Sequence, residues 1–167
     1  MALVKDGALA EDPWLTAETE EELQTEAPLF VTPELWQEAR ERLAGRNAPL
    51  GLRLRSDQST EDLAGELEHF AAIALEFPKF TDGRAFSTAR ILRERLGFEG
   101  ELRAVGAVKR DQLAFLERCG FDAVEVPEGV DAAAWLESLR EFSHWYQPAA
   151  DGLSAIAALR HRPQAAE

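Results

Sequence analysis

Two segments of the chain place basic side chains beside the expected start of a helix. In Pro78–Arg84, Asp82 can cap a helix, Gly83 allows close backbone approach, and Arg84 begins the helix. Backbone N–H groups at such a start favour anions. We therefore predict an anion site here, the competing arrangement being that Asp82 caps its own helix and pairs with Arg84. The candidate ligand-binding residues are Lys79, Asp82, Gly83, Arg84 and Ser87.

The second basic segment, Gly106–Gln112, follows the next expected strand. Its candidate residues are Lys109, Arg110, Asp111 and Gln112. Asp111 also suits the positive end of a helix, which is a sufficient structural reason for its presence. Two basic segments together indicate a ligand that carries phosphate, sulfate or carboxylate. Neither segment matches a P-loop or a dinucleotide-binding glycine pattern.

The sequence lacks the residue patterns that disulfide bonds, metal sites and nucleophilic catalysis require. Cys119 is the single cysteine, so neither an internal disulfide nor a cysteine-rich metal site is expected, and its place before Gly120 predicts a buried thiol. The histidines, His69, His144 and His161, are isolated, and we expect no metal site. No local motif joins a nucleophile to a histidine, no cofactor motif is recognisable, and the sequence identifies no catalytic residue.

The elements that would position these segments alternate between strand and helix. Apolar runs predict strands at 29–31, 50–55, 71–77, 101–105 and 123–126, and helical spacing predicts helices at 33–44, 60–70, 84–96, 110–119 and 131–146. We expect an α/β fold of four or five βα units with a mainly parallel sheet, either open and three-layered or partly barrel-like. Ligands of such folds bind at the carboxyl ends of the strands, where both basic segments and the loop 55–58 lie.

Charged residues also lie inside the expected strands, where parallel sheets are normally apolar. They are Arg53, Arg55, Glu76 and Arg103, with Glu125 in the last strand. Isolated buried charges would cost several kcal/mol unless paired or solvated. Two interpretations stay open: an exposed sheet edge, or a polar cluster near the carboxyl ends of the strands.

Charge and composition divide the chain into three parts. Residues 1–28 carry eight acids and one base, and are expected to form a β-hairpin turning at 5–7 and an acidic connector. Residues 29–150 form the α/β domain and 151–167 an alanine-rich tail. The net charge of −13 argues against binding to nucleic acid or an anionic membrane surface. No apolar run reaches the ~20 residues of a membrane span, and without a signal-peptide pattern we expect a cytoplasmic protein.

The segment Phe77–Arg84 resembles an uncharacterised bacterial family, a domain of unknown function whose members are described as probable oxidoreductases involved in sulfite reduction. The resemblance continues through 87–97, 100–106, 110–112 and 118–122, covers roughly residues 50–147, and is weaker at Asp12–Trp14. The chain departs from the family at Ala107, where an Asp is expected, and at Phe86, where Tyr is common.

The resemblance implies an accessory protein of assimilatory sulfate and sulfite reduction. Its partner would be sulfite reductase or phosphoadenylyl-sulfate reductase, bound through the acidic N-terminal segment or through the helix at 131–146, with Trp135 or Trp145 as an anchor. The oxidoreductase label has no cofactor motif behind it in this sequence. The alternative is a small enzyme or sensor for an anionic metabolite, and unpaired strand edges would favour a homodimer.

Overall fold

The computed structural model describes residues 2–60, 63–139 and 145–150 of the chain. In these ranges eight strands form one curled sheet, so the sheet is larger than the four or five units expected. The strands are β1 (Ala2–Lys5), β2 (Ala8–Ala10), β3 (Leu15–Ala17), β4 (Leu29–Val31), β5 (Leu50–Leu54), β6 (Ala72–Phe77), β7 (Glu101–Gly106) and β8 (Ala123–Val126).

The spatial order of the sheet is β2-β1-β8-β7-β6-β5-β4-β3. Strands β3 to β8 are parallel, and each lies beside the next one in the sequence. Strand β1 joins β8 in the antiparallel direction and forms a hairpin with β2. The hairpin turns at Asp6 and Gly7, both with positive φ (49° and 70°), which matches the twist of the flanking strands.

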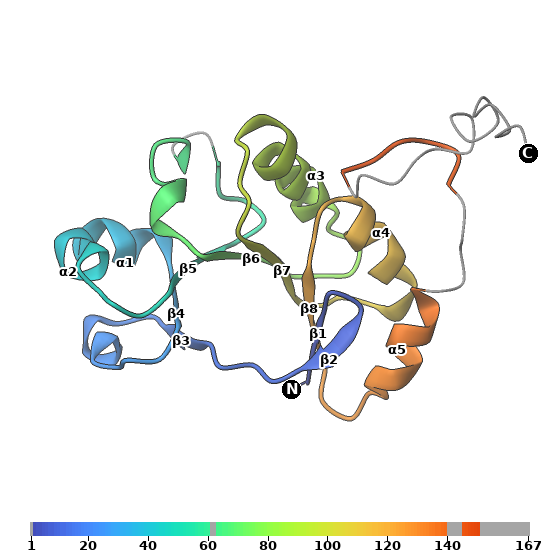
Figure 1. Cartoon of the computed structure of the whole chain (residues 1–167), viewed down its shortest axis with the longest axis horizontal. Coiled ribbons are helices and arrows are strands. Elements are labelled where there is room, and N and C mark those ends of the chain that lie inside the picture. Colours follow the sequence, from blue (N-terminus) through green and yellow to red (C-terminus); the bar gives the residue numbers. More distant parts are fainter. Residues whose placement is uncertain (1, 61–62, 140–144, 151–167) are drawn as a thin grey trace, which may run out of the picture.

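The connection from β2 to β3 shows how strongly the sheet curls. These strands are opposite edges, seven strand spacings apart, which would be ~34 Å in a flat sheet. Ala10 and Leu15 are only five residues apart, so the chain between them spans at most ~18 Å. The sheet must therefore bend until its edges approach. Figure 1 shows residues 11–14 running between these edges, with the helices on the outer side of the curve, an arrangement closer to a partial barrel than to three layers.

The helices are short. They are α1 (Pro33–Glu38), α2 (Arg40–Ala44), α3 (Arg84–Arg90), α4 (Leu113–Arg118) and α5 (Ala132–Ser138), with a π-helical turn η4 (Ile91–Arg95) continuing α3. The 3-10 turns with fully described residues are η1 (Glu20–Leu23), η3 (Leu67–His69) and η5 (Arg110–Gln112). No helix of the described ranges has the length and hydropathy needed to cross a bilayer.

Some helix predictions were wrong. The described residues of the segment 60–70 form no α-helix: Leu63 and the turn η3 have 3-10 geometry, and Gly65 in the middle of this segment weakens a helix. The helix expected at 110–119 begins as the 3-10 turn η5 and becomes α-helical at Leu113. Residues 140–144 of the long C-terminal helix lie outside the described residues.

The two faces of the sheet differ in character because side chains alternate along a strand. On the outer face Leu52, Ile73, Leu75 and Leu102, each no more than 2% exposed, belong to the main core under the helices. The inner face has a second, smaller apolar cluster. It consists of Phe30, Ala72, Ala74 and Val105, with Trp14 packed against it.

Candidate functional site

Three loops at the carboxyl ends of β5, β6 and β7 contact one another. The Ser56 hydroxyl donates to Asp82 Oδ2 (3.0 Å), and Arg84 Nη2 donates to the Ser56 hydroxyl (2.9 Å), joining the first loop to the second. Gln112 Nε2 donates to the carbonyl of Phe80 (3.1 Å), joining the second loop to the third. We call this surface the rim. Parallel strands bring these loops together because all three leave the same edge of the sheet.

At the rim, Arg84 is held by its neighbour Asp82. Its Nε and Nη2 donate to the two carboxylate oxygens at 3.0 and 2.6 Å, and its backbone N–H donates to Oδ1 at 3.2 Å. These bonds from Arg84 hold the pKa of Asp82 well below its usual range. Asp82 therefore neutralises Arg84, as in the competing arrangement, while the N-cap of α3 is Gly83 and the Asp82 carboxylate bonds to the first helical N–H, that of Arg84.

The third loop places a cation against an exposed ring of the second loop. Lys109 Nζ lies 3.6 Å from the centroid of the Phe80 ring, a cation–π contact, and its backbone N–H donates to Gln112 Oε1 (3.0 Å). Phe80 is 51% exposed, and Phe115 on α4 is 55% exposed while packing on Phe86 at 4.8 Å. Sequence reasoning missed both phenylalanines, because an exposed ring cannot be told from a core ring by residue type.

The other predicted rim residues are dispersed. Lys79, Arg110 and Asp111 are exposed. Ser87 is also exposed, but it lines a separate depression on α3 with Arg90 and Glu94 rather than joining the loops.

The charged residues of the strands form a cluster on the inner face. Arg53, Glu76, Arg103 and Glu125 occupy inward positions of β5 to β8, whereas Arg55 lies beyond the end of β5 at the rim, near Glu34 and Asp57 (3.5 Å each). Arg103 is 1% exposed and lies in a central strand, so the exposed-edge interpretation does not hold for it. We call the set Asp12, Arg53, Glu76, Glu101, Arg103 and Glu125 the inner cluster.

Arg103 is the centre of the inner cluster. Its Nε donates to Glu101 Oε1 (2.8 Å) and its Nη1 donates to Asp12 Oδ2 (2.8 Å), with Glu125 Oε1 at 3.7 Å. Its guanidinium lies 5.1 Å from the centroid of Phe30. The Nη2 atom is buried, and no group of the described residues accepts a hydrogen bond from it. The sequence pointed to Arg103 as an anomaly but not to its partners Asp12 and Glu101.

Burial and neighbouring charges act in opposite directions on Glu125. Burial raises its pKa above the ordinary value, and the guanidinium groups of Arg103 and Arg53 partly counteract this. Arg53 lies on β5, three strands from β8, so its influence on Glu125 reflects the curl of the sheet. Arg53 itself pairs with Glu76 at 3.7 Å.

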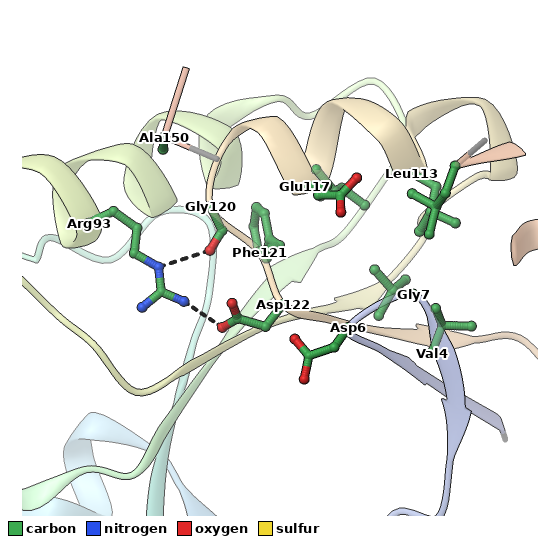
Figure 2. A pocket seen from close by; sticks show the side chains of 13 residues that line it. Val4, Asp6, Gly7, Arg93, Leu113, Glu117, Gly120, Phe121, Asp122 and Ala150 are labelled. Carbon is green, nitrogen blue, oxygen red and sulfur yellow. Dashed lines mark hydrogen bonds and ion pairs between the residues drawn. The ribbon is translucent and has the colours of Figure 1, made fainter. Parts of the chain in front are cut away.

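A separate pocket of about 320 Å³ lies beside the start of β8, at the end of the sheet opposite to the rim (Figure 2). Arg93 lines it, and its guanidinium donates to the carbonyls of Phe98, Gly100 and Gly120 and to Asp122 Oδ2. Figure 2 shows the Asp6 carboxylate below Asp122. With four hydrogen bonds, Arg93 ties α3 and η4 to the start of β8, which is a structural role.

Metal and thiol chemistry find little support in the described ranges. Within them no three His, Cys, Asp or Glu side chains are grouped to hold a metal ion. Cys119 is buried, and burial raises the pKa of its thiol, which lowers its nucleophilicity at neutral pH. Trp135 is 4% exposed, so it belongs to the core and cannot anchor a partner. The ring centroid of Trp145 lies 4.6 Å from the guanidinium carbon of Arg118.

Comparison with known proteins places the chain in a family without assigning its activity. No curated protein matches the sequence. One family model matches residues 51–157, which is more than half of the chain and includes the rim loops and all of the inner cluster except Asp12. The chain therefore belongs to the bacterial proteins of unknown function known as DUF934.

Proposed function

We propose that the protein is an accessory component of assimilatory sulfate and sulfite reduction, which acts by docking on a reductase or its electron donor. We infer the pathway from the resemblance of Phe77–Arg84, and of the segments that follow it, to the family described as involved in sulfite reduction. The docking role comes from the rim. Its polar groups pair largely with one another, as Arg84 does with Asp82, and such pairing suits a preformed binding surface better than a vacant catalytic site.

The observation that carries the docking role is the exposure of two aromatic rings on one surface. Phe80 and Phe115 are more than half exposed, and Gln112, three residues before Phe115, hydrogen-bonds to Phe80. We call Phe80, Phe115 and Lys109 the rim patch. Aromatic side chains are enriched at protein interfaces, where a few such residues carry most of the binding energy.

Charge indicates which partner surface would fit. The whole chain has a net charge of −13, yet the three rim loops (55–58, 78–84 and 106–112) carry five basic residues against three acidic ones. A partner with an acidic surface around an apolar pocket would be steered to the rim and repelled elsewhere. This differs from the sequence expectation of docking through the acidic N-terminal segment or the last helix.

The experiment is affinity measurement against purified sulfite reductase and phosphoadenylyl-sulfate reductase of the same bacterium. The double variant F80A/F115A should weaken binding by about tenfold or more. The variant Leu15→Ala is the control, because Leu15 is as exposed as Phe80 (51% each) but lies on the sheet edge. Absence of a complex with either enzyme, or equal losses in both variants, would contradict the proposal.

A second candidate function is binding of an anionic metabolite at the rim, by an enzyme or a sensor. The exposed Lys79 favours it, since it has no ionic partner within the described ranges. The test is a thermal-shift titration at fixed ionic strength with sulfate, sulfite, phosphate and adenosine 3′,5′-bisphosphate. A ligand-dependent rise that disappears in Arg84→Ala supports it. If Arg84→Ala only lowers the unfolding temperature, Arg84 is a partner of Asp82 and nothing more.

A further inference from the structure

Residues 11–14, which we call the strap, cover the inner face of the curled sheet. The strap joins edge strands β2 and β3 across the opening (Figure 1). It is fixed at two points. Asp12 accepts the hydrogen bond from Arg103, and the Trp14 ring lies 4.5 Å from the ring of Phe30. Glu11, Asp12 and Pro13 are exposed, so the strap is an outer cover rather than part of the core.

Beneath the strap, Arg103 has more donors than acceptors. The side chain is 1% exposed, and Nη2 has no acceptor among the described residues. An unsatisfied N–H on a buried charged group is costly, and native structures rarely retain one without a ligand, ion or water. The guanidinium therefore has an open hydrogen-bonding position next to the one that Asp12 occupies.

The inner face has a second guanidinium in register with the first. In the sheet, Ala74 of β6 pairs with Arg53 on one side and with Arg103 on the other. The two arginines thus flank a small side chain, Ala74, which is 1% exposed and belongs to the smaller apolar cluster. A planar or tetrahedral oxyanion accepts hydrogen bonds from guanidinium groups in this manner.

We propose that the inner face is a binding site for a small oxyanion or carboxylate, held by Arg103 and Arg53, and that Asp12 of the strap is a built-in substitute for this ligand. Asp12 presents a carboxylate to Arg103 as a ligand would, from an exposed segment whose displacement breaks no strand pairing in the described sheet. Ligand binding then requires the strap to move and Asp12 to leave Arg103. The site is separate from the rim, and the inference does not depend on the docking function.

Glu125 supports this assignment through its chemistry. Burial raises the pKa of Glu125 above its ordinary value, so burial works against the charged form that would repel an anion. Glu101 is already engaged by Arg103 and by Lys5 (2.8 Å each), and Glu76 by Arg53. The carboxylate that a ligand would have to displace is therefore that of Asp12.

The experiment compares Asp12→Asn with Glu11→Gln in the full-length protein. Both variants remove one negative charge from adjacent strap positions, but only Asp12 contacts Arg103; Glu11 is exposed and has no partner among the described residues. Acetate, sulfite, sulfate and phosphate are titrated at fixed ionic strength, and affinity is measured by calorimetry. We expect Asp12→Asn to bind one of these anions at least about tenfold more tightly than the wild type and Glu11→Gln to resemble the wild type. The anion that binds separates carboxylate from sulfur and phosphorus oxyanions.

A second variant covers the case in which Asp12→Asn is poorly folded. Trp14→Ala loosens the strap by removing its contact with Phe30, and it keeps every side chain that contacts Arg103. It too should gain anion affinity, and adding Arg53→Gln to either variant should reverse the gain. In Asp12→Asn, the indole N–H resonance of Trp14, assigned by comparison with Trp14→Phe, should shift on titration. If Asp12→Asn and Trp14→Ala bind no anion more tightly than Glu11→Gln, the site does not exist.

Discussion

Asp12 and Arg103 are 91 residues apart in the sequence, yet their side chains meet at 2.8 Å on the inner face of the sheet. The contact links a short segment between the two edge strands to the middle of β7. Because β7 is central, this one pair fixes the distance between the strap (residues 11–14) and the inner face of the middle of the sheet. An ionic contact therefore helps to hold closed a sheet whose edges, β2 and β3, are not paired with each other.

The first prediction concerns Arg103 itself. Arg103→Met should lower the free energy of unfolding by about 3–5 kcal/mol, because it leaves Asp12, Glu101 and Glu125 without the buried cation that compensates them. Arg53→Met is the matched control on the same face. Its side chain is 33% exposed and its partner Glu76 is 32% exposed, so the loss should be about 1 kcal/mol or less. Urea denaturation measures both, and similar losses would show that the inner cluster does not depend on Arg103.

The strands from Leu29 onward were predictable, because buried parallel strands are continuous apolar runs. Strand β3 was not. It has only three residues, Leu15 and Thr16 are exposed, and it lies in a segment whose charge indicated a connector. Its position at the sheet edge depends on the curl, which no local pattern encodes. The lengths of the helices were overestimated for the same reason, because tertiary packing ends each helix before the apolar periodicity of its sequence ends.

The convergence of the rim loops was predictable, because chain order determines their proximity. Loops that leave adjacent parallel strands must lie together, and the contacts of Ser56 with Asp82 and of Gln112 with Phe80 follow from that rule. Charges within strands marked Arg53 and Arg103 as unusual. Their partners were not predictable, because Asp12 reaches Arg103 only after the sheet has curled. The contact between Asp12 and Arg103 could not be predicted because the two residues are far apart in the sequence.

The second prediction tests the packing between strap and sheet. A Cβ at Gly51 would lie 2.5 Å from Phe30 Cδ1 and 2.9 Å from Trp14 Cζ3. Phe30 is buried and held between Trp14 and Arg103, so it cannot swing away, and Gly51→Ala should destabilise the fold by about 1–3 kcal/mol. Gly65→Ala meets no atom within 4 Å and should be neutral or stabilising by less than about 1 kcal/mol. Thermal denaturation distinguishes them, and a harmless Gly51→Ala would mean that the strap does not pack as described.

The third prediction concerns self-association. All three residues of edge strand β2 are exposed, and Leu9 is 55% exposed, so this edge offers unpaired backbone groups beside an apolar side chain. We expect a homodimer in sedimentation velocity at micromolar concentration, and Leu9→Lys should return it to a monomer. Leu15→Lys on the opposite edge is the control and should leave the dimer intact. A monomeric wild type would contradict the prediction.

The last prediction follows from the ionisation of Glu125. Its pKa is raised in the folded protein above the ordinary value of 4.5 because burial disfavours the charged form, so the folded state binds this proton more tightly than the unfolded state. The contribution of Glu125 to stability is therefore greatest below pH 4.5 and is lost as the pH rises through the folded-state pKa. Glu125→Gln cannot ionise, so its stability relative to the wild type should improve as the pH rises from 4.5 through the folded-state pKa of Glu125, and should then stay constant.

Asp82 provides the control of opposite sign. Arg84 lowers its pKa, so the stabilising contribution of Asp82 is present above its unfolded pKa and is lost as the pH falls towards the folded value. Asp82→Asn should therefore lose stability relative to the wild type at pH 7 and approach it in acid. Urea denaturation of both variants across pH 3–8 gives the two slopes. A flat difference for Glu125→Gln would mean that Glu125 is as well solvated in the folded protein as in the unfolded chain, and that the inner face is open to water.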